Sequence, residues 1–307
     1  KPGPDDWLMY SRTYDAQRFS PLNQITTKNV SQLREVFKKE LPAGPHESIP
    51  IVYRGVMYLQ LPGNALQALD AATGAVIWEH KRSASASRAK TIAIYEDMVY
   101  STTPDGFIVA LDARTGEVRW ETKSTGRLTA GAMIVEGKVL SGRACAPRRE
   151  DCYIAAHDAK TGKEVWRFYT AAGSAEPGGD TWAGAPDETR AASTWALPGG
   201  YDPVRRLIYW GVANPTPNTR ANRHGGNTNT IPTESPADLY SNSTVALDPD
   251  TGKLRWYYQH LPGDDWDEDY ANERTLLRTS FNPDPKFVKW INPDVKRGEQ
   301  RDVAVMV

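Results

Sequence analysis

Ala68-Leu-Asp-Ala-Ala-Thr-Gly-Ala-Val-Ile-Trp78 is the stretch that decides the fold, because its pattern recurs three more times. The other copies are Ala110-Leu-Asp-Ala-Arg-Thr-Gly-Glu-Val-Arg-Trp120, Ala156-His-Asp-Ala-Lys-Thr-Gly-Lys-Glu-Val-Trp166 and Ala246-Leu-Asp-Pro-Asp-Thr-Gly-Lys-Leu-Arg-Trp256. Successive aspartates lie 42, 46 and 90 residues apart. The last gap is either two periods or one period with a long insertion. A repeat of roughly 40–45 residues is the signature of propeller blades.

The chemistry of the repeat predicts a strand, a tight turn and a second strand. Asp and Thr have short side chains that bond nearby backbone N–H groups in turns. The glycine accepts a positive φ that other residues resist. The tryptophan can lie flat between adjacent units. A strand of alternating character precedes each copy, at 52–58, 92–100, 133–140 and 207–212. We therefore expect an all-β propeller, with one short helical turn at 29–33.

Composition excludes several classes of protein. The chain has 37 Lys and Arg against 38 Asp and Glu, so there is no basic excess to indicate a nucleic-acid partner. The mean hydropathy is -0.58, and no apolar run approaches the ~20 residues of a membrane helix. No signal peptide is visible at Lys1. The 10 Trp, 14 Tyr, 24 Gly and 22 Pro favour many short strands joined by turns over a helix bundle.

Two further features bear on the state of the chain. Cys145 and Cys152 lie seven residues apart, which fits a disulfide in an oxidising compartment or two free thiols in a reducing one.

Four tryptophan motifs are too few to close an eight-bladed ring. The last residues, Ala304-Val-Met-Val307, read as an apolar strand. We therefore expect 1–307 to be one propeller domain that is truncated at its C-terminal side.

The repeats and the N-terminal stretch resemble the quinoprotein alcohol dehydrogenases, the family of methanol and ethanol dehydrogenases. The matching N-terminal residues are Asp6-Trp7, Tyr10, Gln17-Arg-Phe-Ser-Pro-Leu22, Ile25, Asn29-Val30 and Leu33. The resemblance implies an eight-bladed propeller, about half of which is present. It also implies oxidation of an alcohol to an aldehyde or ketone with pyrroloquinoline quinone (PQQ) and Ca²⁺ or a lanthanide ion. It further implies a bacterial periplasmic protein that passes electrons to a soluble cytochrome c or a similar acceptor.

The resemblance also assigns site residues. It places Glu47, Lys90 and Thr129 on the polar edge of PQQ, and Trp195 under its ring, with a hydroxyl from Ser193 or Thr194. Asn214 before Pro215 resembles a metal ligand. In Gly263-Asp-Asp-Trp-Asp267, Asp267 resembles the catalytic aspartate, which also binds the metal. Asp269 matches an extra metal ligand of lanthanide-using relatives, although an acidic run such as 264–269 is often just a solvated face.

Three departures from the family pattern concern the same site. Many relatives carry adjacent disulfide-bonded cysteines over PQQ, but the segment 84–90 contains none. Lys90 stands where the family has an arginine, which keeps the charge but loses the planar fork. No glutamate occupies 146–147, where the family has a metal ligand, so Glu150 or Asp151 is the candidate replacement. Without the cysteine lid, and with a long loop at 220–238 near the cofactor mouth, we expect a substrate bulkier than methanol.

Two other interpretations stay open. A propeller with similar tryptophan-docked repeats also serves as a binding scaffold in an outer-membrane assembly lipoprotein, and a degenerate dehydrogenase would keep the motifs without the cofactor. The contexts of Trp195, Asn214 and Asp267 favour the enzyme. His46, His157, His224 and His260 have no metal-ligand spacing and receive no role. No Cys-x-x-Cys-His haem motif occurs, so the electron acceptor is a separate protein or lies in further sequence.

Overall fold

The computed structural model describes residues 3–82, 90–224 and 237–306, and its regular structure is almost entirely antiparallel β-sheet. The strands are β1 (Ile51–Tyr53), β2 (Val56–Leu61), β3 (Ala65–Asp70), β4 (Val76–Lys81), β5 (Ala93–Tyr95), β6 (Met98–Thr102), β7 (Phe107–Asp112), β8 (Val118–Lys123), β9 (Ala132–Val135), β10 (Lys138–Ser141), β11 (Tyr153–Asp158), β12 (Glu164–Tyr169), β13 (Ala191–Ala192), β14 (Gly200–Asp202), β15 (Leu207–Gly211), β16 (Pro215–Thr216), β17 (Ser243–Leu247), β18 (Leu254–Gln259), β19 (Thr275–Phe281) and β20 (Glu299–Val305). The helical elements are η1 (Val30–Gln32), η2 (Arg149–Asp151), η3 (Gly179–Trp182), η4 (Asp187–Thr189) and α1 (Arg220–Arg223).

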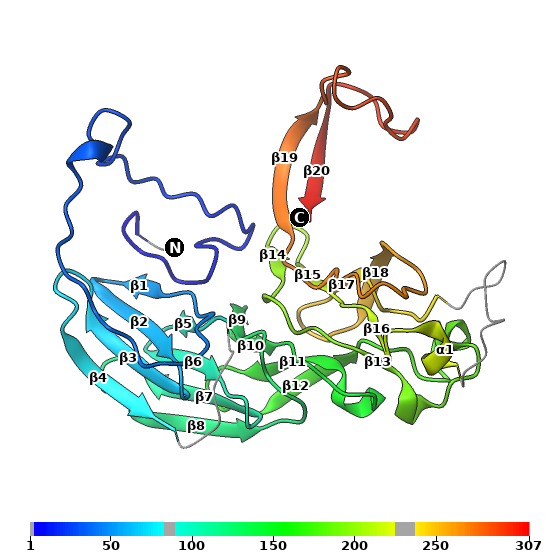
Figure 1. Cartoon of the computed structure of the whole chain (residues 1–307), viewed down its shortest axis with the longest axis horizontal. Helices are drawn as coiled ribbons and strands as arrows, with labels where there is room; N and C mark the ends of the chain where they lie inside the picture. The colour runs from blue at the N-terminus through cyan, green and yellow to red at the C-terminus, as the bar shows by residue number, and fades with distance from the viewer. Residues whose placement is uncertain (1–2, 83–89, 225–236, 307) are drawn as a thin grey trace.

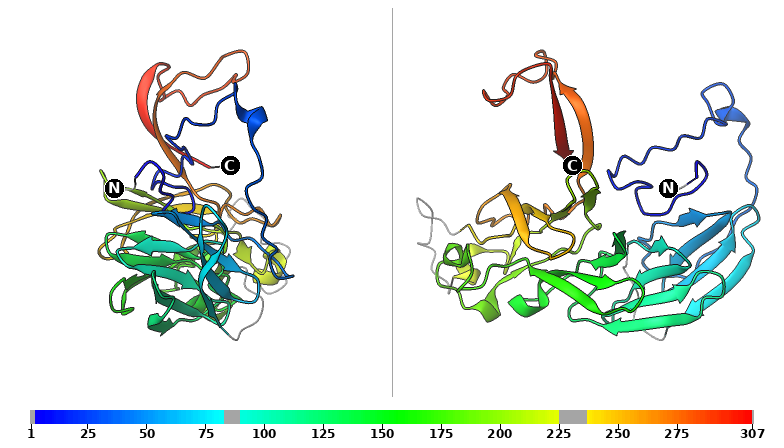
Figure 2. Two further views of the ribbon diagram at one scale, coloured as in Figure 1. Left: turned by 90° about the vertical axis from the view of Figure 1, so that its left-hand side faces the viewer. Right: turned by 180° about the vertical axis from the view of Figure 1, so that it is seen from behind.

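Four four-stranded sheets follow one another around an arc (Figure 1). Their strand orders are β1-β2-β3-β4, β5-β6-β7-β8, β9-β10-β11-β12 and β14-β15-β17-β18. The first strand of a sheet is the more buried and the fourth the more exposed, as β9 and β12 show. The sheets are therefore consecutive blades, which confirms the predicted repeat units. The β19–β20 hairpin stands away from them in every view (Figure 2).

Each repeat forms the predicted turn between the third and fourth strands of a blade. Asp158 shows the pattern: its Oδ1 accepts the backbone N–H groups of Lys160 at 3.1 Å and Thr161 at 2.8 Å. Gly162 then takes a φ of +71°. The tryptophan pairs across the strands with the alanine of its own repeat, as Trp166 does with Ala156. The small alanine leaves room for the indole.

Three of the four tryptophans dock on the next blade. The indole N–H of Trp78 donates to the carbonyl oxygen of Ala113 at 3.0 Å, and its ring covers Gly116 so closely that an added Cβ there would lie 2.5 Å from the indole. Trp120 and Trp166 repeat this contact on Gly162 and Gly252. Trp256 is the exception, since it has no following repeat in the chain and is 42% exposed.

Of the four single strands predicted before the motifs, 207–212 is confirmed as β15, and the other three are wrong in detail. The run 52–58 is a hairpin in which β1 and β2 pair across a turn at Arg54-Gly55. The runs 92–100 and 133–140 turn in the same way between β5 and β6 and between β9 and β10. Arg54, Glu96 and Glu136 take positive φ values in these turns. Two-residue turns of this kind are favoured in hairpins, and the glycines after Arg54 and Glu136 were the missed signal.

The 90-residue gap between the third and fourth aspartates is one period with long insertions. The fourth blade uses β14, β15, β17 and β18, and inserted segments precede β14 and separate β15 from β17. The N-terminal segment ties this blade back to the first one. Trp7 exchanges two backbone hydrogen bonds with Val52, and the Tyr10 hydroxyl donates to the carbonyl oxygen of Pro198 at 2.7 Å. The short helical turn predicted at 29–33 is present as η1.

No helix in the described ranges is long and apolar enough to cross a membrane.

Candidate functional site

The predicted site residues come from one end of the blades. Glu47, Lys90, Thr129 and Trp195 precede the first strands β1, β5, β9 and β14. Asn214 follows β15, and Asp267 and Asp269 follow β18. In an antiparallel four-stranded blade, the start of the first and third strands and the end of the second and fourth strands lie at the same edge. Because neighbouring blades share this direction, side chains distant in sequence converge there.

Lys90 and Trp195 form the centre of the first half of the site. The Lys90 ammonium lies 3.0 Å from Oε2 of Glu47 and 4.9 Å from the centre of the Trp195 ring. The backbone N–H of Lys90 donates to the Thr129 carbonyl oxygen at 3.3 Å. The Thr129 hydroxyl in turn donates to the Trp195 carbonyl oxygen at 3.2 Å. Four blades thus hold a cation over an indole face, beside a carboxylate and a hydroxyl.

The two hydroxyls next to Trp195 point in different directions. Thr194 is buried, and its Oγ1 accepts the backbone N–H of Arg143 at 2.9 Å, so it is committed to the core. Ser193 is partly exposed, and its Oγ accepts the backbone N–H of Cys145 at 3.0 Å. Cys145 is disulfide-bonded to Cys152, with 5.4 Å between the Cα atoms. Of the two pairing states left open by the spacing, the structure has the disulfide, and it fixes the loop beside Ser193.

Asn214, Asp267 and Asp269 form the second half of the site. Asp269 accepts the Trp195 indole N–H at 3.2 Å through Oδ2 and the backbone N–H of Asn214 at 3.4 Å through Oδ1. The Asn214 amide donates to Oδ1 of Asp267 at 2.8 Å. A continuous series of contacts therefore runs from Glu47 through Lys90, Trp195, Asp269 and Asn214 to Asp267.

The second half carries uncompensated negative charge. Among the described residues, no lysine or arginine forms an ion pair with Asp267 or Asp269. Burial of its carboxyl group raises the pKa of Asp269, and the charges of Asp267 and Asp264 act in the same direction, while hydrogen bonds from Trp195 and Asn214 oppose them. Two carboxylates beside an amide oxygen are the ligands that a hard cation prefers. These residues therefore fit a metal ion, once the Asn214 amide turns its oxygen inward.

The first half fits PQQ, which the family resemblance implies. PQQ is a flat quinone that carries carboxylates. The indole face of Trp195 offers a surface for such a ring, and the Lys90 ammonium offers a cation for its negative groups. The hydroxyls of Thr129 and Ser193 now donate to the carbonyl oxygens of Trp195 and Cys145, and either can donate to the cofactor once its O–H rotates away. The cofactor roles of these residues stay predictions, as does the metal role of Asn214 and Asp269.

The candidate replacements for the missing metal glutamate do not join the site in the described structure. Both lie in η2, where Asp151 accepts a hydrogen bond from Arg148 at 2.9 Å. Among the described residues, no group of three or more His, Cys, Asp or Glu side chains is placed to hold a metal ion, so neither Glu150 nor Asp151 is gathered with Asp267 and Asp269. Two other predictions lie partly outside the described residues: positions 84–89 of the segment without the cysteine pair, and positions 225–236 of the loop at 220–238.

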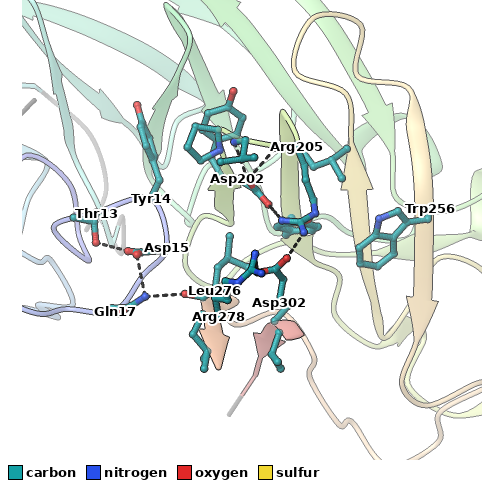
Figure 3. Close-up of a pocket in the computed structure, with 18 residues that line it drawn as sticks. Thr13, Tyr14, Asp15, Gln17, Asp202, Arg205, Trp256, Leu276, Arg278 and Asp302 are labelled. Atoms are coloured by element: carbon teal, nitrogen blue, oxygen red, sulfur yellow. Dashed lines mark hydrogen bonds and ion pairs between the residues drawn. The ribbon is translucent and has the colours of Figure 1, made fainter. Parts of the chain in front are cut away.

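A groove of about 810 Å³ lies elsewhere, between the fourth blade, the N-terminal segment and the β19–β20 hairpin (Figure 3). Trp256 lines it, together with Asp202, Arg205 and Asp302, and none of the predicted site residues does. Arg205 donates to Asp202 at 2.8 Å and also bonds Asp302, while Asp15 accepts hydrogen bonds from the neutral side chains of Thr13 and Gln17. We do not identify this groove with the chemistry, because it has no convergent uncompensated groups.

Sequence reasoning missed one class of residue, the groups that support the acidic run at 264–269. Asp264 is buried and accepts hydrogen bonds from two backbone N–H groups of the run. Asp265 pairs with Arg223 at 3.5 Å. The run is therefore not a uniform solvated face. Nothing in its local pattern distinguishes these acids from Asp267, so only the surroundings could reveal them.

Family models match most of the chain. Residues 122–298 match the model described as glucose/ethanol/alcohol dehydrogenase, beta-propeller domain, which is more than half of the sequence. Residues 20–146 match the model of the outer membrane protein assembly factor BamB. The first match contains Trp195, Asn214, Asp267 and Asp269, whereas the second contains none of these four residues.

Curated proteins and solved structures agree with the first match. The chain is 34% identical over 313 residues to the quinohemoprotein alcohol dehydrogenase ADH IIB of Pseudomonas putida, covering 92% of the chain and 44% of that protein. It is 32% identical over 310 residues to a lanthanide-dependent methanol dehydrogenase of Methylacidiphilum fumariolicum, covering 89% of the chain and 49% of that protein. The structure of quinohemoprotein alcohol dehydrogenase ADHIIG from Pseudomonas putida HK5 superposes with a TM-score of 0.84 at 31% identity, covering 99% of the chain and 45% of that structure. The chain therefore spans about half the length of the relatives that it matches.

Proposed function

Because the chain belongs to the glucose/ethanol/alcohol dehydrogenase β-propeller family, we propose that the protein oxidises an alcohol to the aldehyde or ketone with PQQ as its cofactor. The observation that carries this proposal is the continuous series of contacts from Lys90 through Trp195, Asp269 and Asn214 to Asp267. A binding scaffold has no need to bring an indole face, a cation and two unpaired carboxylates together. The indole and both carboxylates lie within the dehydrogenase match and outside the BamB match, whereas Lys90 lies within the BamB match alone.

Asp267 is the group that removes the alcohol proton. Its Oδ1 meets the Asn214 amide at 2.8 Å, and no described hydrogen bond occupies its Oδ2. The residue is exposed, so an alcohol can reach this oxygen. A carboxylate within hydrogen-bond reach of a hydroxyl acts as a general base, which typically contributes 10²–10⁴-fold to the rate. PQQ, when bound, supplies the redox chemistry that accepts the two electrons of the alcohol.

Lys90 and Trp195 bind and orient the cofactor. The Lys90 ammonium, which is mostly shielded from water, attracts the negative groups of PQQ more strongly than an exposed lysine would. Its single point of positive charge gives less angular control than the arginine fork of many relatives. Trp195 is itself fixed, since Asp269 accepts its indole N–H and Thr129 donates to its carbonyl oxygen. Glu47 holds the ammonium over the ring.

Asn214, Asp267 and Asp269 would hold the metal ion, which is Ca²⁺ or a lanthanide. Three oxygen-bearing side chains with two formal charges suit a hard cation, and the second charge favours a trivalent one. A named relative is lanthanide-dependent, which supports the same assignment. The Asn214 amide oxygen and the two carboxylates are the only ligands that we assign.

The proposal also covers the protein that accepts the electrons and the cellular compartment in which the enzyme works. We infer that electrons pass to a soluble cytochrome c or similar protein, as the family resemblance implies. The Cys145–Cys152 disulfide supports an oxidising compartment, since such bonds are rare in the reducing cytosol, and we infer the bacterial periplasm.

The test is a dye-linked alcohol oxidation assay on the longest natural form of the protein that contains this chain. The protein is reconstituted with or without PQQ, with Ca²⁺ or La³⁺, and offered primary, secondary and bulky cyclic alcohols. We expect turnover that requires both PQQ and one ion, and a loss of at least about 100-fold in Asp267→Asn. Glu268→Gln, which removes a neighbouring exposed charge, is the matched control. Absence of PQQ-dependent turnover under every condition would instead support the scaffold.

A further inference from the structure

The acidic run at 264–269 contains one buried carboxylate that no part of the proposed mechanism uses. Asp264 is only 2% exposed, while Asp265, Asp267 and Glu268 are exposed and the carboxyl group of Asp269 is half-buried. Burial of a carboxylate is costly unless the charge is satisfied by hydrogen bonds or a partner. The contacts of Asp264 therefore indicate what its burial achieves.

Both oxygens of Asp264 bond the loop that carries Asp267. Oδ1 accepts the backbone N–H of Trp266 at 2.6 Å, and Oδ2 accepts the backbone N–H of Glu268 at 2.9 Å. Trp266 and Glu268 are the two residues that flank Asp267. One carboxylate therefore fixes the chain immediately before and immediately after the proposed general base.

Asp267 needs such support because its backbone is strained. Its φ is +65°, in the left-handed region that non-glycine residues rarely occupy. Strained residues of this kind persist only where the surroundings hold them. The direction of the Asp267 side chain, and the path of the chain to Asp269, both depend on this conformation.

Asp264 is in turn anchored to the rigid part of the blade. Its Oδ2 accepts the Asn242 amide N–H at 2.9 Å, next to the start of β17. Arg223, which is 5% exposed, donates to the Asp264 carbonyl oxygen at 2.9 Å and to Oδ2 of Asp238 at 3.1 Å. The loop at 264–269 is thus fixed to β17 and to α1 through Asp264.

We propose that Asp264 is a positioning residue that holds Asp267 and Asp269 in the geometry needed to bind the metal ion. This inference rests on the proposed function, because it concerns the same site. Asp264 is buried and acts through the two backbone N–H groups beside Asp267. Partners of this kind, one step removed from the metal, typically change metal affinity or activity 10–100-fold when they are mutated.

The experiment measures metal binding directly with Tb³⁺ in the longest natural form of the protein. The indole N–H of Trp195 lies 3.2 Å from Asp269, so excitation of tryptophan should sensitise Tb³⁺ emission at the site. Asp264→Asn keeps the shape of the side chain but replaces one acceptor oxygen with an N–H donor, so at least one backbone N–H loses its partner. We expect Tb³⁺ to bind 10–100-fold more weakly. In the dye-linked assay, kcat should fall while KM for the alcohol stays nearly unchanged.

Glu268→Gln is the matched control, since it removes one charge from the same run and keeps the backbone N–H that Asp264 binds. Equal Tb³⁺ affinity in Asp264→Asn and Glu268→Gln would overturn the inference. If Asp264→Asn does not fold, Asn242→Gly is used instead. Glycine adopts the φ of +47° at that position, so this variant removes only the hydrogen bond from the Asn242 amide to Asp264. We then expect Tb³⁺ to bind roughly 3–10-fold more weakly, and an unchanged affinity would overturn the inference.

The outcomes separate this inference from the proposed function. If the native protein sensitises Tb³⁺ but oxidises no alcohol, the proposed function fails while the Tb³⁺ comparison still decides the role of Asp264. If the native protein is active and the two variants bind Tb³⁺ equally, only the role of Asp264 fails. If the native protein neither sensitises Tb³⁺ nor turns over, both are overturned.

Discussion

The repeat turns and the loop at 264–269 use a buried or half-buried aspartate in the same way. In the third repeat, Asp158 accepts the backbone N–H groups of residues two and three positions later, and Gly162 takes a φ of +71°. In the loop, Asp264 accepts N–H groups two and four positions later, and Asp267 takes a φ of +65°. The left-handed residue lies four positions after the aspartate in the repeat and three in the loop, and its type changes from glycine to aspartate.

The residue at the left-handed position therefore distinguishes a turn that serves packing from a loop that presents a functional side chain. Glycine at the left-handed position removes the strain and leaves space for an aromatic ring, which is Phe37 at Gly74 and the tryptophan of the preceding blade in the other repeats, so the repeat turn serves packing alone. An aspartate there retains the strain and presents a carboxylate at the end of the blade. Arg54, Glu96 and Glu136 also take a positive φ in hairpin turns, so it is the carboxylate placed beside Asn214, and not the strain alone, that sets Asp267 apart.

The largest expected effect comes from replacing Asp267 with glycine, the residue that the repeat turns have at their left-handed position. Asp267→Gly should preserve the backbone, because glycine adopts a φ of +65° freely, and should leave the free energy of unfolding unchanged or up to ~1 kcal/mol higher. Turnover should nevertheless fall about 10²–10⁴-fold, since the proposed base is lost. Steady-state kinetics with saturating PQQ and ion, together with urea unfolding, measure both quantities. A variant that kept more than a tenth of the native kcat would remove Asp267 from the mechanism.

The converse change replaces the left-handed glycine of a repeat turn with alanine, which adds a Cβ atom. In Gly162→Ala the new Cβ would lie 2.5 Å from the Trp120 ring, at a φ of +71°. We expect a loss of roughly 3–5 kcal/mol in the free energy of unfolding, from left-handed strain and overpacking together. Gly184→Ala is the matched control, because Gly184 has a φ of +77° with nothing within 4 Å of an added Cβ. If urea unfolding gave equal losses for both variants, tryptophan docking would not explain the repeat glycine.

A smaller expected effect is a pH dependence of the free energy of unfolding that arises from the histidine of the third repeat. His157 stands where the other copies have Leu69, Leu111 and Leu247. Burial lowers the pKa of His157 to about 4; Glu164 opposes this effect, and Arg143 and Arg167 add to it. The unfolded chain therefore binds the proton first as pH falls, so the folded state has its full stability above about pH 6.5 and loses it towards pH 4.

His157→Leu should remove that dependence. Between pH 6.5 and 4, the native protein should lose on the order of 2–3 kcal/mol more than the variant does, as followed by urea unfolding across this range. The comparison uses the slope with pH, because leucine also changes packing at neutral pH. Parallel pH profiles for the two proteins would mean that His157 does not titrate differently in the folded and unfolded states.

The positions of the site residues were predictable only in part. The family resemblance singled out Trp195, Asn214 and Asp267, and the structure links them through Asp269. It could not tell Ser193 from Thr194, since the direction of each side chain depends on whether Arg143 or Cys145 lies beside it. The supporting role of Asp264 was also hidden, because it is created by Asn242 and Arg223 from other parts of the blade.

The sequence by itself determined the repeat unit of this protein, because the turn is local. An aspartate, a threonine and a glycine within five residues satisfy their own backbone groups whatever surrounds them. Only the tertiary structure decided that the 90-residue gap is a single blade with insertions, that Cys145 pairs with Cys152, and which acid of the run 264–269 is buried. Burial and side-chain direction are set by neighbours that are distant in sequence, and such contacts exist only once the blades have packed together.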